Sequence, residues 1–333
     1  MTDGYERESG VRAWLTAWGM RLLAGLTLLV FSELVWLSHD LLAVEAGTWA
    51  TLAALYLLLG ALVVDLLARF RVGELFGWLA VAGLYGLLQG ALVTATAFQS
   101  LPFSLVTRPL GLHTLGSGML GLAFVYWQLR GGWTARRAVL LAAGGLAWGV
   151  WVRWSPLLPA GSFPVPAFPL AAAVAGGGLA VLGGLARLVR RLDVQPADYC
   201  LHPWEWLLVA AGLLAAFWRA AGLAEIGIAE AAILGGLAGY LLVLLFLLRG
   251  EARVPFLERA LPKQGGGGQV LVLAVVIWLA AGWLGYALPG AGPDGLPLRA
   301  LTTGLTLFGI LWLPALSVAL GLRIFTRLFR EGG

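Results

Sequence analysis

The sequence predicts an all-α protein that crosses a membrane about ten times. Sixty per cent of the 333 residues are hydrophobic and only 12% are charged, a composition for which a soluble domain of this length has too little interior. The apolar residues also occur in stretches of about 20, the length at which a helix crosses a hydrocarbon core. We therefore expect a single integral membrane domain over residues 1–333.

Ten apolar stretches meet this length requirement. They cover residues 15–37, 47–68, 75–97, 109–129, 137–153, 167–187, 204–223, 229–248, 269–289 and 300–322. The first is too long for a cleaved signal peptide and is not followed by a small-residue cleavage pattern, so we expect it to remain as an anchor. The small-xxx-small pairs Gly86/Gly90 and Gly235/Gly239 predict close helix packing, and the tryptophans at span ends, Trp151 among them, predict an interfacial belt.

The basic residues predict the orientation. When alternate loops are assigned to opposite sides, all but four of the 22 Lys and Arg residues fall on one side, and loops rich in these residues stay in the cytoplasm. Both termini are therefore predicted to be cytoplasmic, in the inner or plasma membrane of a prokaryote; the source is inferred from arginine greatly outnumbering lysine. The net charge of +5 follows from this asymmetry and does not indicate nucleic-acid binding.

Two parts of the chain resemble each other. Segments 40–46 and 225–231 each carry two acids five residues apart, and each precedes an apolar helix that ends in arginines. Six spans separate the two copies, an even number, so the copies would be parallel, as in some transporter folds. The repeat would relate spans one to four with spans seven to ten, in halves 13–130 and 204–325 joined by the two spans within 137–187.

Four arginines on the outer side are the main sequence clue to function. Arg108, Arg153, Arg219 and Arg299 lie at or just inside span ends, where both the charge bias of insertion and desolvation disfavour a cation. Six outer carboxylates can neutralise them. We predict that Arg108 pairs with Glu33, Asp40 or Glu45, and that Arg299 pairs with Glu225, Glu230 or Asp294. On the inner side, Asp65 and Glu74 flank Arg69 and Arg71 and predict local neutralisation.

Two interpretations of the outer charges remain open: ion pairs that hold helix ends together, and an outward-facing polar site. Asp40 and Glu225 also suit helix N-termini, where the helix dipole favours negative charge. His113 lies near the outer surface, but one histidine at a membrane boundary does not predict a metal site. The candidate substrate-binding residues are Glu33, Asp40, Glu45, Arg108, His113, Arg219, Glu225, Glu230 and Arg299.

Several classes of chemistry have no support in the sequence. It contains no GxxxxGK[ST], HExxH or GxSxG motif, and its one cysteine, Cys200, leaves no cluster for a metal. No cofactor and no metal is therefore predicted. No acid is predicted at the middle of the membrane either, which argues against a carrier that uses a midplane carboxylate to bind protons.

Three functions remain. The first is a transporter or flippase-like protein whose outer arginines bind an anionic solute or lipid headgroup. The second is an outer-leaflet transferase or hydrolase acting on a lipid-linked phosphate, with Arg108 or Arg299 binding phosphate and Asp40 or Glu33 as general base. The third is an accessory or structural membrane subunit without a catalytic site. The expected partners are membrane lipids, an anionic small molecule or lipid-linked substrate, and an oligomer or membrane-complex partner, with no nucleic acid.

Overall fold

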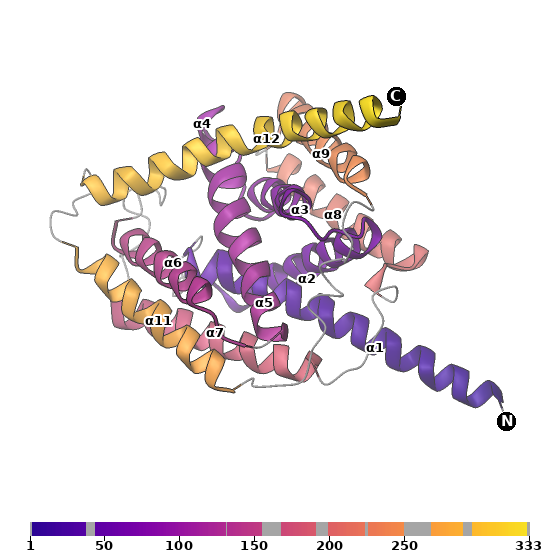
Figure 1. Cartoon of the computed structure of the whole chain (residues 1–333), viewed down its shortest axis with the longest axis horizontal. Coiled ribbons are helices and arrows are strands. Elements are labelled where there is room, and N and C mark those ends of the chain that lie inside the picture. Colours follow the sequence, from indigo (N-terminus) through magenta and orange to yellow (C-terminus); the bar gives the residue numbers. More distant parts are fainter. Residues whose placement is uncertain are drawn as a thin grey trace.

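The computed structural model describes residues 2–37, 44–130, 132–154, 168–190, 199–223, 226–249, 268–288 and 295–331, and every regular element within these ranges is helical (Figure 1). The elements in chain order are α1 (Thr2–Leu29), η1 (Val30–Val35), α2 (Ala46–Arg69), α3 (Leu75–Leu88), η2 (Gln89–Val93), α4 (Phe103–Thr107), η3 (Arg108–Met119), α5 (Leu120–Arg130), α6 (Ala135–Trp154), α7 (Phe168–Arg190), α8 (Pro203–Gly222), α9 (Ile228–Leu247), α11 (Gly268–Tyr286) and α12 (Leu296–Glu331). The three η segments are π-helices. A helix satisfies all its backbone hydrogen bonds internally, which an apolar chain in lipid requires.

The all-α, multi-pass class is confirmed. Helices occupy all ten predicted stretches, and seven helices within the described ranges are long and apolar enough to cross a membrane: Trp14–Val35, Ala46–Arg69, Leu75–Val93, Phe168–Val189, Pro203–Gly222, Ile228–Leu247 and Leu296–Arg323. The other three stretches differ for physical reasons. Arginines at both ends make α6 more polar, the apolar part of α11 is shorter, and the fourth stretch is split between η3 and α5. Ten crossings therefore remain a prediction.

The first three helices and η3 form the centre of the fold. Helix α1 packs along α2, and α3 packs along η3. Helices α8, α9 and α12 cover this centre from outside, on α2, α3 and η3 respectively, while α6 and α11 pack side by side as a pair (Figure 1). The outer helices present large apolar side chains such as Leu207 and Trp218 outwards, which is what a lipid environment favours.

Glycines set the closest helix contacts. A Cβ added at Gly60 of α2 would lie 2.3 Å from the backbone nitrogen of Gly25 in α1. The predicted pair on α3 has this role too, because a Cβ at Gly86 would lie 2.4 Å from the carbonyl oxygen of Pro109 in η3. Gly235 and Gly239 on α9 meet nothing within 4 Å. The small-xxx-small prediction is therefore confirmed for α3 and wrong for α9, whose glycines face outwards.

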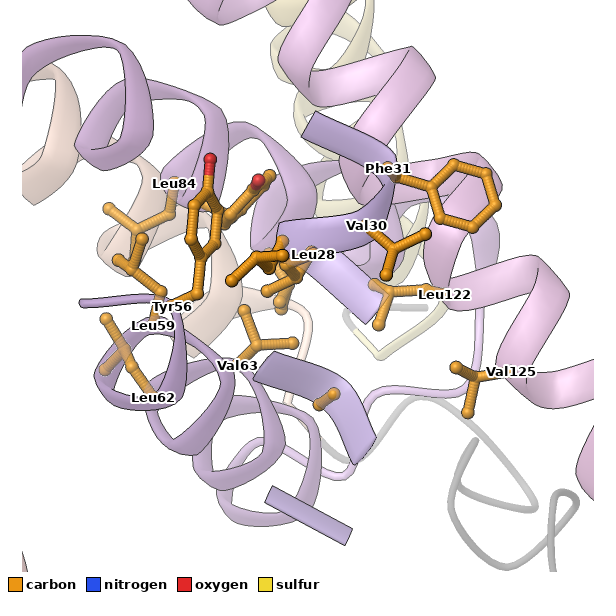
Figure 2. Close-up of a cluster of buried hydrophobic side chains, with 14 of the residues drawn as sticks. Leu28, Val30, Phe31, Tyr56, Leu59, Leu62, Val63, Leu84, Leu122 and Val125 are labelled. Atoms are coloured by element: carbon orange, nitrogen blue, oxygen red, sulfur yellow. The ribbon is translucent and has the colours of Figure 1, made fainter. Parts of the chain in front are cut away.

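The apolar core joins α1, η1, α2, α3 and α5. Figure 2 shows side chains from these elements in contact, with Tyr56 of α2 lying among Leu28, Leu59 and Leu84. Tyr56 is completely buried, as are Leu28 and Leu59 to within 1%. The hydroxyl group of this tyrosine connects the apolar core to the polar residues described below.

A cluster of polar side chains joins α1 to α8. The Nη1 atom of Arg21 in α1 donates to Oε1 of Glu205 in α8 at 2.8 Å, and the two side chains are only 1% and 0% exposed. The indole N–H groups of Trp14 and Trp18 donate to the same oxygen, at 3.2 and 2.8 Å. This ion pair joins the first helix of the chain to the eighth.

Helix α2 also helps to hold α8 and the segment before it. Asp65 accepts two hydrogen bonds from Arg69, each at 2.9 Å, which confirms the predicted local neutralisation. It also accepts the backbone N–H of Leu201 at 2.6 Å, so it holds the segment that leads into α8. We call Arg21, Asp65, Arg69 and Glu205 the clasp. The prediction for Glu74 was wrong, because it pairs with the distant Arg323 at 2.9 Å.

Candidate functional site

Three π-helical segments meet within the core. Segment η3 packs on α3 and contacts both η1 and η2. π-Helical turns are rare and are frequently found at functional sites, so we take this region, which we call the π junction, as the candidate site. The local sequence favours the π-helical geometry: η3 carries Gly111, Gly116 and Gly118, and Pro109, which has no N–H donor, interrupts the regular α-helical bonds where α4 passes into η3.

Side chains from other helices bind the backbone of each π segment. Trp148 and Trp151 of α6 donate their indole N–H groups to the carbonyls of Val35 and Trp36 at the end of η1, each at 2.8 Å. Trp312 of α12 donates to the Leu110 carbonyl of η3 at 3.0 Å. The interfacial prediction for Trp151 was wrong, because it is 2% exposed and acts as a buried donor. These bonds give backbone carbonyls of the π segments a side-chain donor from another helix.

On η2 the side chain that binds the backbone is an arginine in place of a tryptophan. The Nη2 atom of Arg219 in α8 donates to the carbonyl of Leu92 at 3.2 Å. Unlike the tryptophans, Arg219 is charged and exposed. A backbone carbonyl of η2 is therefore held by a side chain that can also reach an external anion.

A chain of three buried side chains crosses the π junction. The Tyr56 hydroxyl donates to Oε1 of Glu33 in η1, and Nε2 of Gln89, the first residue of η2, donates to the Tyr56 oxygen at 3.2 Å. All three side chains are 0% exposed. We call Glu33, Tyr56 and Gln89 the buried triad. It connects η1 to η2 through α2.

A second polar contact lies beside the triad. The hydroxyl oxygens of Ser32 in η1 and Tyr85 in α3 are 2.6 Å apart. Tyr85 lies within electrostatic range of both Tyr56 and Glu33, and Ser117 of η3 lies next to it. Polar groups from η1, α2, α3 and η3 therefore share one interior region.

Four polar atoms at the π junction are buried without a hydrogen-bond partner among the described residues. They are Nε1 of Trp36, Oε1 of Gln89, Nδ1 of His113 and Oγ of Ser117, on side chains that are at most 3% exposed. Buried polar atoms in folded proteins are nearly always bonded, and inside a membrane they mark functional sites.

Arg108 lies at the start of η3 and is half-buried. Its Nη1 atom is 3.5 Å from the side-chain oxygen of Gln99, and its charge acts on the imidazole of His113. Gln99 follows η2 in the chain, so Arg108 and Arg219 both bind the stretch from Leu92 to Gln99. The structure thus brings four predicted site residues, Glu33, Arg108, His113 and Arg219, to the π junction.

The remaining predicted residues lie elsewhere or are not described. Glu230 accepts the N–H of Gly227 at 3.1 Å and so caps α9. Glu45 is exposed at the N-cap of α2, and Arg299 is exposed in the first turn of α12. Asp40, Glu225 and Asp294 lie outside the described residues. The predicted pairings of Arg108 and Arg299 with outer carboxylates stay predictions. Arg153, the fourth arginine predicted on the outer side, donates to the Tyr286 carbonyl, and its guanidinium lies 5.3 Å from the centre of that ring.

Sequence reasoning did not assign Tyr56, Tyr85 or Ser32 to the site. Tyrosine and serine are common in membrane helices, and nothing in their spacing indicates that they share a buried region. The available signal was that α2 and α3 each carry a polar side chain in an otherwise apolar stretch. Compared with protein-family models, with curated proteins and with solved structures, the chain matches none, so its function is inferred from these side chains.

Proposed function

We propose that this protein is a multi-pass membrane transporter or flippase-like protein that binds an anionic solute or lipid headgroup at Arg108 and Arg219. The observation that carries the proposal is the buried triad within the π junction, directly connected to the segment that both arginines bind. Buried polar groups within a membrane protein cost free energy, and they often belong to a functional site. Transporters place such groups where helices depart from regular α geometry.

The arginines favour an anion as the ligand. A guanidinium presents five N–H donors in a planar fork that matches the oxygens of carboxylate and phosphate groups. Arg219 is exposed, while its bond to Leu92 ties it to η2. An anion that draws Arg219 towards itself would release the Leu92 carbonyl. Binding at the surface would then change the hydrogen bonding of a π-helical segment in the core.

The proposed orientation puts this region outside and both termini in the cytoplasm. Figure 1 shows the N-terminal end of α1 and the C-terminal end of α12 both at the right of the view. The parallel repeat of halves 13–130 and 204–325 and the ten crossings belong to the same proposal.

Labelling of single cysteines tests the orientation. In a Cys200→Ser background, cysteines at positions 162 and 292 should react with a membrane-impermeant maleimide in intact cells, because they follow helices that end outside. Cysteines at positions 132 and 266 should react only after permeabilisation. Of these positions only Gly132 is among the described residues, and it lies in the loop before α6. If the cysteines at positions 132 and 266 react in sealed cells, the protein has the opposite orientation. The arginines predicted to lie outside would then lie in the cytoplasm, where a cation is favoured.

Reconstitution in vesicles tests the function. The protein should accelerate reorientation of a fluorescent anionic phospholipid, or exchange of a carboxylate or phosphate solute, relative to protein-free vesicles. Arg108→Gln and Arg219→Gln should each slow that process about tenfold or more, since a hydrogen bond to a charged group contributes about 1.5–3 kcal/mol. Arg136→Gln is the matched control, because Arg136 is exposed at the start of α6, away from the π junction.

The two arms of this assay separate the sources of the anion. Activity in the lipid arm alone would assign a headgroup, and activity in the solute arm alone would assign a free anion. Wild-type protein that is inactive in both arms would overturn the proposal. Cleavage of an added lipid-linked diphosphate without movement would favour the outer-leaflet enzyme instead.

A further inference from the structure

The buried triad can run its hydrogen bonds in either direction. In the observed direction, Gln89 Nε2 donates to the Tyr56 oxygen and the Tyr56 hydroxyl donates to the Glu33 carboxylate. Each hydroxyl has one proton to donate. A proton added to Glu33 therefore allows the carboxylic O–H to donate to Tyr56, whose own O–H then turns to Gln89. To accept that bond, the Gln89 amide must present its oxygen in place of its nitrogen.

Reversal changes what the amide offers at its other end. The Oε1 atom of Gln89 is a buried acceptor without a hydrogen-bond partner among the described residues. After reversal, the NH₂ group occupies that position, so an acceptor becomes a donor. Protonation of one carboxyl group would thus invert the hydrogen-bonding character of a buried position on η2. The same segment carries the Leu92 carbonyl that binds Arg219.

We propose that Glu33 is a proton-binding site and that binding of this proton is coupled to binding of the anion at Arg108 and Arg219. The proton comes from bulk water: the carboxylate and one proton give the carboxylic acid, and release reverses the step. Segment η2 links the two sites, because Gln89 at its start responds to the proton and Leu92 near its end responds to the anion. The coupling rests on the proposed transport function, whereas the proton site itself does not.

Among the described residues, Tyr56 faces Glu33 from α2 and Tyr85 faces it from α3. The charged or titratable groups on the elements packed around them include Arg21 of α1, Asp65 and Arg69 of α2, and Arg108 and His113 of η3, while Arg219 of α8 binds η2. Helix α7, which packs against η1, carries no titratable side chain between Phe168 and Ala186. Asp65 belongs to the clasp, so a proton taken up at the π junction has Glu33 as its only carboxyl acceptor among the described residues there.

Infrared difference spectroscopy tests the proton site without any substrate. Between acid and alkaline buffer, reconstituted wild-type protein should show the C=O band of a protonated carboxyl that shifts in D₂O. The band of Glu33 should be missing in Glu33→Gln and moved in Tyr56→Phe, which removes the hydroxyl that bonds to it. Glu45→Gln is the control, because Glu45 is exposed and its loss should leave the buried band in place. A Glu33→Gln spectrum that keeps every wild-type carboxyl band would overturn the proposal.

Tyr56→Phe keeps the test decisive if Glu33→Gln does not fold. A buried band that fails to move in folded Tyr56→Phe would also overturn the proposal, because that side chain donates directly to Glu33.

A second measurement tests the coupling. In vesicles that accumulate the anion, collapse of an imposed proton gradient should abolish accumulation by the wild type and leave the residual exchange of Glu33→Gln unchanged. A Glu33 band without any wild-type transport would refute the proposed function and keep the proton site. Wild-type transport without a Glu33 band would refute the proton site and keep the proposed function.

Discussion

Replacement of Glu205 by alanine is expected to lower the free energy of unfolding by about 3–5 kcal/mol. The change leaves the Arg21 guanidinium, 1% exposed, in the core without its 2.8 Å partner. It also removes the acceptor for the indole N–H groups of Trp14 and Trp18. Unfolding in detergent with increasing denaturant, followed by circular dichroism, measures the loss.

The matched control is Glu74→Ala. Glu74 pairs with Arg323 at 2.9 Å, nearly the same distance, but both side chains are well exposed, at 41% and 37%. An exposed pair contributes only about 0–1 kcal/mol because water and salt screen it. Equal losses from Glu205→Ala and Glu74→Ala would show that the clasp is solvated. The double variant Arg21→Met, Glu205→Leu should recover most of the lost stability, since it leaves no unpaired buried charge.

Replacement of Gly149 by alanine is expected to separate α6 from α11. The added Cβ would lie 1.9 Å from the carbonyl oxygen of Gly282 and 2.8 Å from the backbone nitrogen of Tyr286. Both neighbours are backbone atoms and cannot rotate away, so the helices must move apart. We expect a loss of about 2–3 kcal/mol, at the upper end of the usual cost of overpacking.

Gly177→Ala on α7 is the control for helix propensity. A Cβ there meets nothing within 4 Å, and alanine favours a helix over glycine by about 1 kcal/mol, so this variant should match or exceed the stability of the wild type. Thermal unfolding gives the stabilities, and a distance between spin labels on α6 and α11 reports the separation. An unchanged distance in Gly149→Ala would contradict the close backbone contact.

The helices could be predicted from the sequence because the signal for them is local. A stretch of about 20 apolar residues has to form a helix in lipid, whatever it packs against. The ion pair of Asp65 with Arg69 was predictable for the same reason, since residues four apart share a helix face.

The partners of Arg21, Glu74 and Tyr56 depend on which helices are neighbours. That choice is made by glycine contacts such as Gly25 with Gly60, whose pairing no local pattern specifies. For the candidate site, the predicted outer position of Arg108 singled out a residue that lies at the start of η3, and its role in a site stays a prediction. The π-helical geometry could not be predicted from the sequence, because it arises where η3 packs against α3 and α12.

The clasp also constrains how the protein is made. Arg21 enters the membrane within the first span, and Glu205 follows 184 residues later. At a synthesis rate of roughly 5–20 residues per second, the arginine waits about 10–40 s for its partner. During that interval its long side chain must reach the polar interface or a group supplied by the insertion machinery. The position of the first helix is therefore fixed only when the eighth has been inserted, so a nascent chain that stops before residue 205 retains an unpaired cation in its first span.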